Sequence, residues 1–172
     1  MLTTYYSQPV YYPLGAYYPP VGVYEPRAAF KPVWETSLAE ATALIQEAVQ
    51  DERHDELFYD QLIRLAPDRD QADMIAGIRD DERQHNRMFK EIYAILTGHQ
   101  ASTAAQEPPE KVGTYVEGLE KAIRGEWAAV EKYRRIWFGL PPGIYRDTVY
   151  GIILDEQKHA DKYNYLLEKN RA

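Results

Sequence analysis

The chain has 172 residues, of which 45% are hydrophobic and 27% are charged, a composition that suits one globular domain with a full core. It contains no cysteine, which excludes disulfides, thiol catalysis and thiolate-bound metal clusters, so any metal must be held by His, Asp or Glu. The net charge is −7, and because neutralising phosphates requires a basic surface, nucleic acid is not expected as a partner.

Neither an export signal nor a membrane-spanning segment is expected from the sequence. No basic residue precedes Arg27, and no apolar run is long enough for a transmembrane helix. We therefore expect no membrane partner and a cytoplasmic location.

Residues 1–34 differ in composition from the rest of the chain. They hold seven of the fifteen tyrosines and six of the eleven prolines, but only three charged residues, Glu25, Arg27 and Lys31. Tyr-Tyr pairs recur every six residues, and the prolines between them disfavour helix, so an extended Tyr/Pro-rich arm is expected. The alternative is a flexible tail. So many rings with so little charge favour contact with an apolar surface, and we expect a homodimer or a larger assembly.

Two helices are predicted directly after the arm. Ser37 and Glu40 form a capping-box pattern, and apolar residues then recur at helical spacing up to Pro67, which ends the first helix. A second segment of the same periodicity follows and reaches Gly98, a residue typical of the position after a helix C-terminus.

Two further helices follow a polar linker. The linker covers Gly98 to Pro109, and the third helix is expected to begin near Pro109 and to end at a break over Gly139 to Gly143. The fourth helix then runs to near the end of the sequence. Four long amphipathic helices without a strand pattern predict an all-α four-helix bundle over residues 35–172. About a dozen linker residues at roughly 3.3 Å each span such a bundle, so we expect a long crossover that makes the second and third helices parallel.

The bundle sequence is an internal duplication with a constant offset of 74 residues. The matched pairs are Glu52 and Glu126, Tyr59 and Tyr133, Pro67 and Pro141, Asp81 and Asp155, Glu82 and Glu156, and His85 and His159. In each half the two glutamates lie 30 residues apart with the proline midway, so each glutamate is roughly 22 Å of helix from the same turn. The glutamates and histidines of both halves are therefore expected to meet in the middle of the bundle.

Carboxylates that are buried side by side cost many kcal/mol or become protonated, unless cations neutralise them. Carboxylate and imidazole ligands suit Fe(II) and Mn(II). A single E-x-x-H tetrapeptide is common on solvated helix surfaces, but here it recurs in register, inside the apolar stripe and opposite a lone glutamate. The sequence therefore predicts a site for two divalent ions, iron or manganese, with the ligands Glu52, Glu82, His85, Glu126, Glu156 and His159.

Over about residues 37–169 this pattern resembles the ferritin-like di-iron carboxylate superfamily, and in particular rubrerythrins and bacterioferritins. The ligands of that superfamily follow the order Glu, E-x-x-H, Glu, E-x-x-H on four helices. The resemblance implies that Glu52 and Glu126 each favour one metal, that Glu82 and Glu156 bridge the two metals, and that His85 and His159 supply one nitrogen each.

The resemblance also implies roles beside the metals for four residues, Tyr59, Tyr133, Asp81 and Asp155. Each aspartate is expected to accept the second ring N–H of the histidine on the opposite hairpin, with solvation at a helix surface as the alternative. The tyrosines correspond to phenols next to the site in the superfamily, with simple core packing as the alternative.

Several positions depart from the relatives. Ala129 stands where rubrerythrins carry an additional glutamate, and Arg83 stands where bacterioferritins carry the Met that binds haem, so no haem is expected. Without cysteine the chain has no rubredoxin module, so a peroxidase activity would need an external reductant. Asp55 and Glu56 are expected to be solvated or in salt bridges rather than to be ligands.

The resemblance implies a rubrerythrin-like di-metal oxidoreductase that acts on Fe(II), hydrogen peroxide or O2. One alternative is a manganese catalase-like dismutase, which needs no reductant. Another is a non-enzymatic coat or assembly protein, in which the arm mediates assembly and the bundle binds metal. Tyr-rich extensions are similar to those of ferritin-like proteins from sporulating bacteria, which implies a spore-associated location as the alternative to a free cytoplasmic protein.

Overall fold

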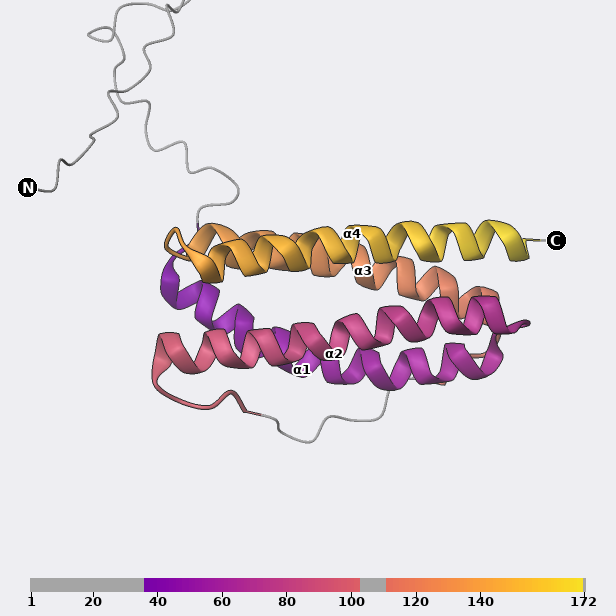
Figure 1. Cartoon of the computed structure of the whole chain (residues 1–172), viewed down its shortest axis with the longest axis horizontal. Coiled ribbons are helices and arrows are strands. Elements are labelled where there is room, and N and C mark those ends of the chain that lie inside the picture. Colours follow the sequence, from indigo (N-terminus) through magenta and orange to yellow (C-terminus); the bar gives the residue numbers. More distant parts are fainter. Residues whose placement is uncertain (1–35, 103–110, 172) are drawn as a thin grey trace, which may run out of the picture. The chain divides into compact units, whose positions relative to one another are not determined.

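The structure, a computed structural model, describes residues 36–102 and 111–171, and within these ranges it does not describe the side chains of residues 52–55. The described residues form four helices and no strand (Figure 1): α1 (Leu38–Leu65), α2 (Arg69–Thr97), α3 (Tyr115–Gly139) and α4 (Ile144–Asn170). The predicted all-α four-helix bundle is therefore confirmed. The predicted arm of residues 1–34 lies outside the described residues. No described helix is both long and apolar enough to span a membrane.

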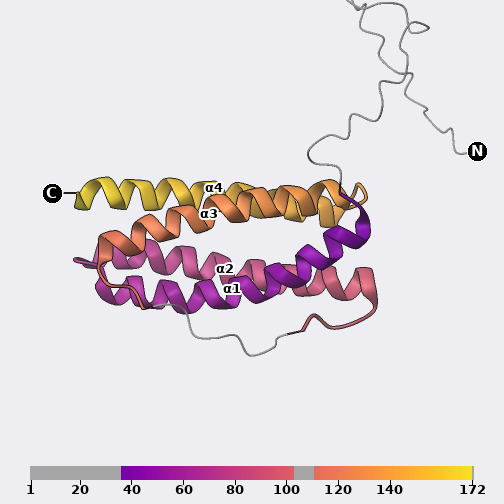
Figure 2. The same cartoon turned by 180° about the vertical axis from the view of Figure 1, so that it is seen from behind.

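The four helices are arranged as two antiparallel hairpins, α1–α2 and α3–α4, that pack on each other. Each helix packs most extensively on its hairpin partner, and across the hairpins α1 packs on α3 and α2 on α4. Helices α2 and α3 run in the same direction, as both views of the bundle show (Figures 1 and 2). This order requires a connection along the whole bundle between α2 and α3.

The two described ends of this connection both contact α1. At its start, the Ser102 amide donates to Gln46 Oε1 at 2.8 Å, and Gln46 Nε2 donates to the Ser102 carbonyl at 3.0 Å. At its end, the Val112 amide donates to Gln61 Oε1 at 3.1 Å. Gln46 and Gln61 are separated by roughly 22 Å of helix, so the two described ends of the connection lie far apart along the bundle and the predicted long crossover is confirmed.

Helix ends lie where side chains satisfy the terminal amides and carbonyls. Ser37 and Glu40 form the expected capping box at the start of α1, and Asp68 caps α2 by accepting from the Gln71 amide at 2.9 Å. Gly98 ends α2 in the left-handed conformation with φ of 74°, which glycine adopts without strain.

The start of the third helix differs from the prediction. Helix α3 begins at Tyr115, not near Pro109, which lies outside the described residues. Thr114 and Glu117 form a capping box at this start, with the Glu117 amide donating to Thr114 Oγ1 at 3.2 Å. Val112 therefore precedes the helix, and its amide is bonded to Gln61 instead.

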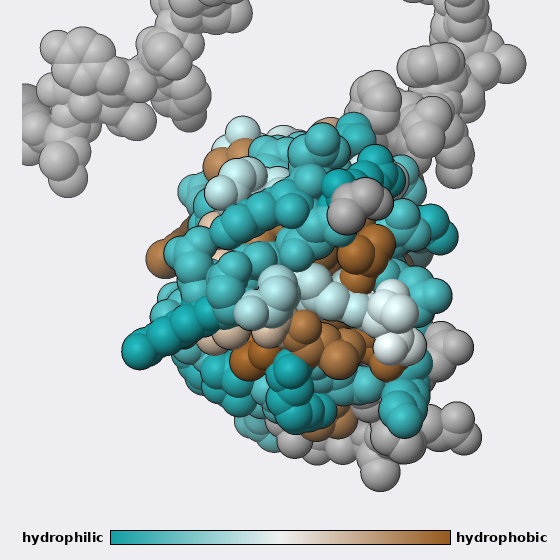
Figure 3. Space-filling model, turned by 90° about the vertical axis from the view of Figure 1, so that its right-hand side faces the viewer, coloured by the Kyte–Doolittle hydropathy of each residue, from teal (hydrophilic) through white to brown (hydrophobic). Residues whose placement is uncertain are grey.

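The core consists of two apolar clusters, one toward each end of the bundle. Cluster 1 contains Leu44, Ile45, Ala48, Val49, Phe89, Ile92, Tyr133, Ile136, Leu140, Val149, Ile152 and Ile153. Cluster 2 contains Phe58, Tyr59, Leu62, Ile75, Ile78, Leu119, Ala122, Ile123, Tyr163, Leu166 and Leu167. Cluster 2 lies toward the end that carries the α1–α2 turn, where apolar side chains occupy the middle of the face and hydrophilic ones surround them (Figure 3).

The sequence repeat is also a repeat of the packing. At the offset of 74 residues, Leu62 of cluster 2 is equivalent to Ile136 of cluster 1. Ile45 of cluster 1 is likewise equivalent to Leu119 of cluster 2. Each cluster therefore combines one end of the first hairpin with the equivalent end of the second. The charged residues between the clusters are consequently held from both sides by packed apolar side chains.

Gly139 fixes how closely α1 and α3 approach at the end that contains cluster 1. A Cβ atom at this position would lie 2.6 Å from the Ala41 Cβ and 2.8 Å from the Ser37 carbonyl oxygen. A Cβ at Gly125, on the same helix, would have no neighbour within 4 Å.

We expect the G139A variant to be less stable than the wild type by about 1–3 kcal/mol, because the added methyl forces two packed backbones apart. The matched G125A variant should gain about 0.5–1 kcal/mol, because alanine is the better helix former at an open position. Denaturant titration of both variants measures the change in unfolding free energy. Equal stability of G139A and the wild type would contradict this packing.

Candidate metal centre

Five ionisable side chains lie between the two apolar clusters. Their exposed fractions are 3% or less, and they come from three helices: Glu82 and His85 from α2, Glu126 from α3, and Glu156 and His159 from α4. All five were predicted as ligands from the repeat. The sixth predicted ligand, Glu52, belongs to α1, and its side chain lies outside the described residues.

These side chains direct their polar atoms toward one another. Among the described residues, one potential ligand atom from each of four side chains lies within 4.8 Å of the others; the four are Glu82, Glu126, Glu156 and His159. His85 joins them, because its Nδ1 lies 3.0 Å from Glu156 Oε1 and 3.2 Å from Glu82 Oε2. His159 Nδ1 lies 3.2 Å from Glu82 Oε1, and the two imidazole rings stack at 5.9 Å. Both histidines therefore present the same nitrogen to the carboxylates.

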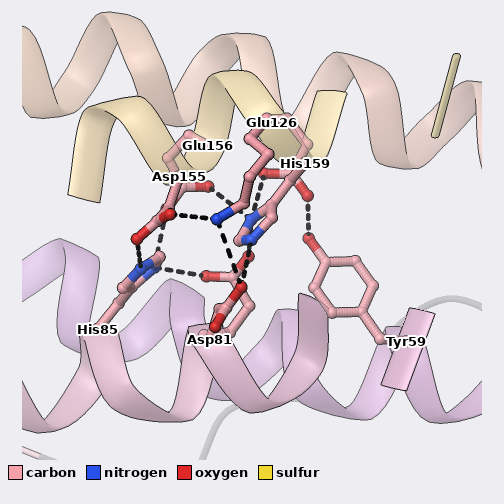
Figure 4. A network of polar contacts seen from close by, with 9 residues as sticks. Tyr59, Asp81, His85, Glu126, Asp155, Glu156 and His159 are labelled. Carbon is pink, nitrogen blue, oxygen red and sulfur yellow. Dashed lines mark hydrogen bonds and ion pairs between the residues drawn. The ribbon is translucent and has the colours of Figure 1, made fainter. Parts of the chain in front are cut away.

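The other nitrogen of each histidine meets an aspartate of the opposite hairpin (Figure 4). His159 Nε2 lies 3.1 Å from Asp81 Oδ2, and His85 Nε2 lies 3.5 Å from Asp155 Oδ2. A carboxylate at this nitrogen favours the tautomer with the proton on Nε2, which leaves the lone pair of Nδ1 directed at the glutamates. The aspartates thus occupy the places that the resemblance implied for them.

The two predicted tyrosines are both buried, with exposed fractions of 4% for Tyr59 and 3% for Tyr133. Tyr59 Oη donates a hydrogen bond of 2.9 Å to Glu126 Oε1, which links α1 to the carboxylates (Figure 4). Tyr133 packs on Phe89 in cluster 1, with ring centroids 4.9 Å apart. Under the repeat, the residue that corresponds to Glu126 is Glu52, whose side chain lies outside the described residues.

One turn beyond the site, the two halves of the sequence repeat carry different kinds of residue. In the first hairpin, Glu56 forms a salt bridge with Arg83 at 2.7 Å, as expected. The residues at the equivalent positions of the second hairpin are Val130 and Gln157, which carry no charge. They line a hollow of about 480 Å³ together with Trp127, Glu131, Arg134, Ala160 and Asp161.

The charges of this cluster are unbalanced when no cation is bound. Burial raises the pKa of Glu126 to about 7, and the nearby Glu82 carboxylate adds to this effect. Burial alone would lower the pKa of His159, but the surrounding carboxylates, Glu82 foremost, outweigh it and raise the pKa. Oxygen donors with neutral imidazole nitrogens match the preferences of Fe(II) and Mn(II), and divalent ions remove the repulsion. The residues present therefore fit a metal centre.

One polar residue of this region was not predicted from the sequence. Lys158 Nζ lies 2.5 Å from Asp155 Oδ1 and 4.0 Å from Asp81 Oδ2. Burial acts to raise the pKa of Asp155, but the hydrogen bonds and charges of Lys158 and His85 together outweigh it and hold the pKa below its ordinary value. The only sequence signal was a lysine three residues after Asp155 on one helix, a spacing that is common on helix surfaces.

Two antiparallel hairpins joined by a long crossover, with carboxylates and histidines gathered in the middle, define a ferritin-like di-iron carboxylate bundle. The chain belongs to the rubrerythrin family, whose sequence model matches residues 43–167. Comparison with curated proteins gave no significant match, and comparison with solved structures gave none either.

We expect the metal-free protein to lose stability as the pH rises from about 4.5 to about 7. Over this range the unfolded chain ionises at Glu126 while the folded chain retains the proton, so ionisation favours unfolding. The raised pKa of His159 acts in the same direction, because the stabilising charged form is lost as the pH rises. The Glu126 contribution is at most about 3 kcal/mol.

Denaturant titration of metal-free wild type and of the E126Q variant at several pH values measures this effect. The difference between their unfolding free energies isolates Glu126 from all other titrating groups, and it should shift in favour of E126Q as the pH rises. A constant difference between pH 4.5 and 7.5 would contradict the burial of an ionisable Glu126.

Proposed function

We propose that the protein is a di-metal oxidoreductase that uses a pair of iron ions, or alternatively manganese ions, to reduce hydrogen peroxide or O2 or to oxidise Fe(II). The observation that carries this proposal is the convergence of Glu82, Glu126 and Glu156 with two histidines that present Nδ1 to them. Membership of the rubrerythrin family supports it.

We assign the ligands to the two metal positions by the distances of each carboxylate from the two imidazoles. Glu82 has one oxygen near His85 and the other near His159, so its carboxylate lies between the two imidazoles and is suited to be shared by two ions. Glu156 has the same arrangement, with one oxygen 3.0 Å from His85 Nδ1 and the other 3.8 Å from His159 Nδ1. Glu126 lies on the His159 side only, and by the repeat we assign Glu52 to the His85 side.

Two redox-active ions held by these residues would supply one electron each for the two-electron reduction of a peroxide. Hydrogen peroxide, two electrons and two protons give two water molecules, so an external reductant must restore the electrons. The side chains around the site serve to keep the ligands in place. The Tyr59 hydroxyl holds Oε1 of Glu126, the aspartates hold the imidazoles by Nε2, and the apolar clusters exclude bulk water.

We expect the wild type to bind two transition-metal ions per chain after anaerobic loading with Fe(II). The E82A or E156A variant should lose both ions, because each removes a carboxylate that serves two metals, whereas E52A should retain part of the metal. Elemental analysis with a matched protein concentration measures the stoichiometry. Less than one ion per chain in the wild type would contradict a di-metal centre, and equal losses in all three variants would contradict the shared role.

Peroxide consumption by protein loaded separately with iron and with manganese distinguishes the candidate reactions. A peroxidase-type oxidoreductase should consume stoichiometric peroxide alone and continue only when a reductant is added. Continuous consumption without reductant, accompanied by O2 release, identifies a catalase-like dismutase instead. Absence of any consumption by fully loaded protein, with E82A as the control, favours a metal-binding assembly protein over an enzyme.

A further inference from the structure

The two aspartates that contact the histidines lie at the surface between α2 and α4. About 37% of the Asp81 side chain and 38% of the Asp155 side chain is exposed, whereas the histidine side chains that they contact are buried. An exposed carboxylate can rotate toward water at little cost, and the imidazole would then lose the partner that sets its tautomer. The orientation of both imidazoles therefore depends on what holds these two carboxylates.

Lys158 is the residue placed to hold both carboxylates. It binds Oδ1 of Asp155, and the remaining oxygen of that carboxylate faces His85. It also lies 4.0 Å from Asp81 Oδ2, the oxygen that faces His159. One ammonium group thus connects an aspartate of α4 with an aspartate of α2, and the contacts run from His85 through Asp155, Lys158 and Asp81 to His159.

The internal repeat indicates that this lysine serves both halves of the site. The residue equivalent to Lys158 in the first hairpin is Gln84, which has no charge to offer a carboxylate. A second lysine is not required if one residue reaches both aspartates, and Asp81 and Asp155 lie close enough across the α2–α4 interface for that. An ordinary helix-surface pair would involve Asp155 alone, three residues away on the same helix.

We propose that Lys158 is a positioning residue that ties Asp155 to Asp81 and thereby holds both imidazoles with Nδ1 directed at the carboxylates. This inference rests on the proposed metal centre only where it concerns metal affinity. The orientation of the histidines is a property of the metal-free chain and is testable without metal or activity.

The experiment uses the full-length, metal-free protein with ¹⁵N-labelled histidine, at a pH where both imidazoles are neutral and a tautomer is defined. The variants are K158M, which removes the charge, K158R, which retains it, and K162M, a matched control that removes a lysine one turn further along α4. NMR measures the tautomer and the solvent exchange of the Nε2 protons of His85 and His159, assigned with H85Q and H159Q. Circular dichroism verifies that each variant retains its helix content.

In K158M we expect mixed tautomers and faster exchange of the Nε2 protons for both histidines, with wild-type behaviour in K158R and K162M. The apparent dissociation constant for Fe(II) or Mn(II) should rise about tenfold in K158M, at the low end of the effect of removing a partner of a metal-bound histidine. Unchanged signals of both histidines in folded K158M would overturn the proposal. A change confined to His85 would overturn it as well, because Lys158 would then act on Asp155 only.

The same experiment separates this inference from the proposed function. If the wild type binds no metal but K158M alters both histidines, the metal centre is wrong and the positioning role stands. If the wild type binds two ions and K158M has the same metal affinity and the same histidine signals, the metal centre stands and Lys158 is a surface ion pair.

Discussion

The structure depends on the cost of placing carboxylates in the middle of an apolar bundle. Glu82, Glu126 and Glu156 are almost fully buried, and each contacts a group that donates or can carry positive charge. Removing these ions from water opposes folding, so the free energy that holds the helices together comes from the two apolar clusters. The clusters lie on both sides of the charged layer, so packed apolar side chains oppose separation of the helices at both of its edges. The apolar clusters thus stabilise the fold, and the layer between them holds the ionisable side chains.

The site also explains why two hairpins are needed. Each hairpin contributes one E-x-x-H motif, but the aspartate that contacts a given histidine comes from the opposite hairpin. Tyr59 likewise reaches from the first hairpin to Glu126 of the second. One hairpin therefore contains neither a complete set of charges nor the groups that orient its own histidine. The cluster of carboxylates and histidines is therefore assembled only when the two hairpins pack together, and the connection between α2 and α3 keeps both in one chain.

Periodicity, caps and the 74-residue offset were sufficient to predict the helices, the crossover and the burial of five charged residues. These features are encoded by which residues share a helix face, and a repeat of the pattern indicates which faces meet. The start of α3 was wrong because Pro109 suggested a helix beginning, while the capping box of Thr114 and Glu117 lies further on. The contact of Lys158 with Asp81 could not be predicted, because a spacing along one helix carries no information on how far an exposed side chain reaches across to another.

The two hairpins differ at the equivalent positions one turn beyond the glutamates. On the α1–α2 side, the salt bridge of Glu56 with Arg83 fills the position one turn beyond the glutamates. On the α3–α4 side, Val130 and Gln157 leave a hollow there, and Ala160, which lines it, directly follows His159. The second hairpin therefore carries a hollow beside the helix turn that holds His159. Two identical hairpins would carry the same residues at equivalent positions, whereas duplication within one chain permits one position to keep an ion pair while its equivalent lines a hollow without charge.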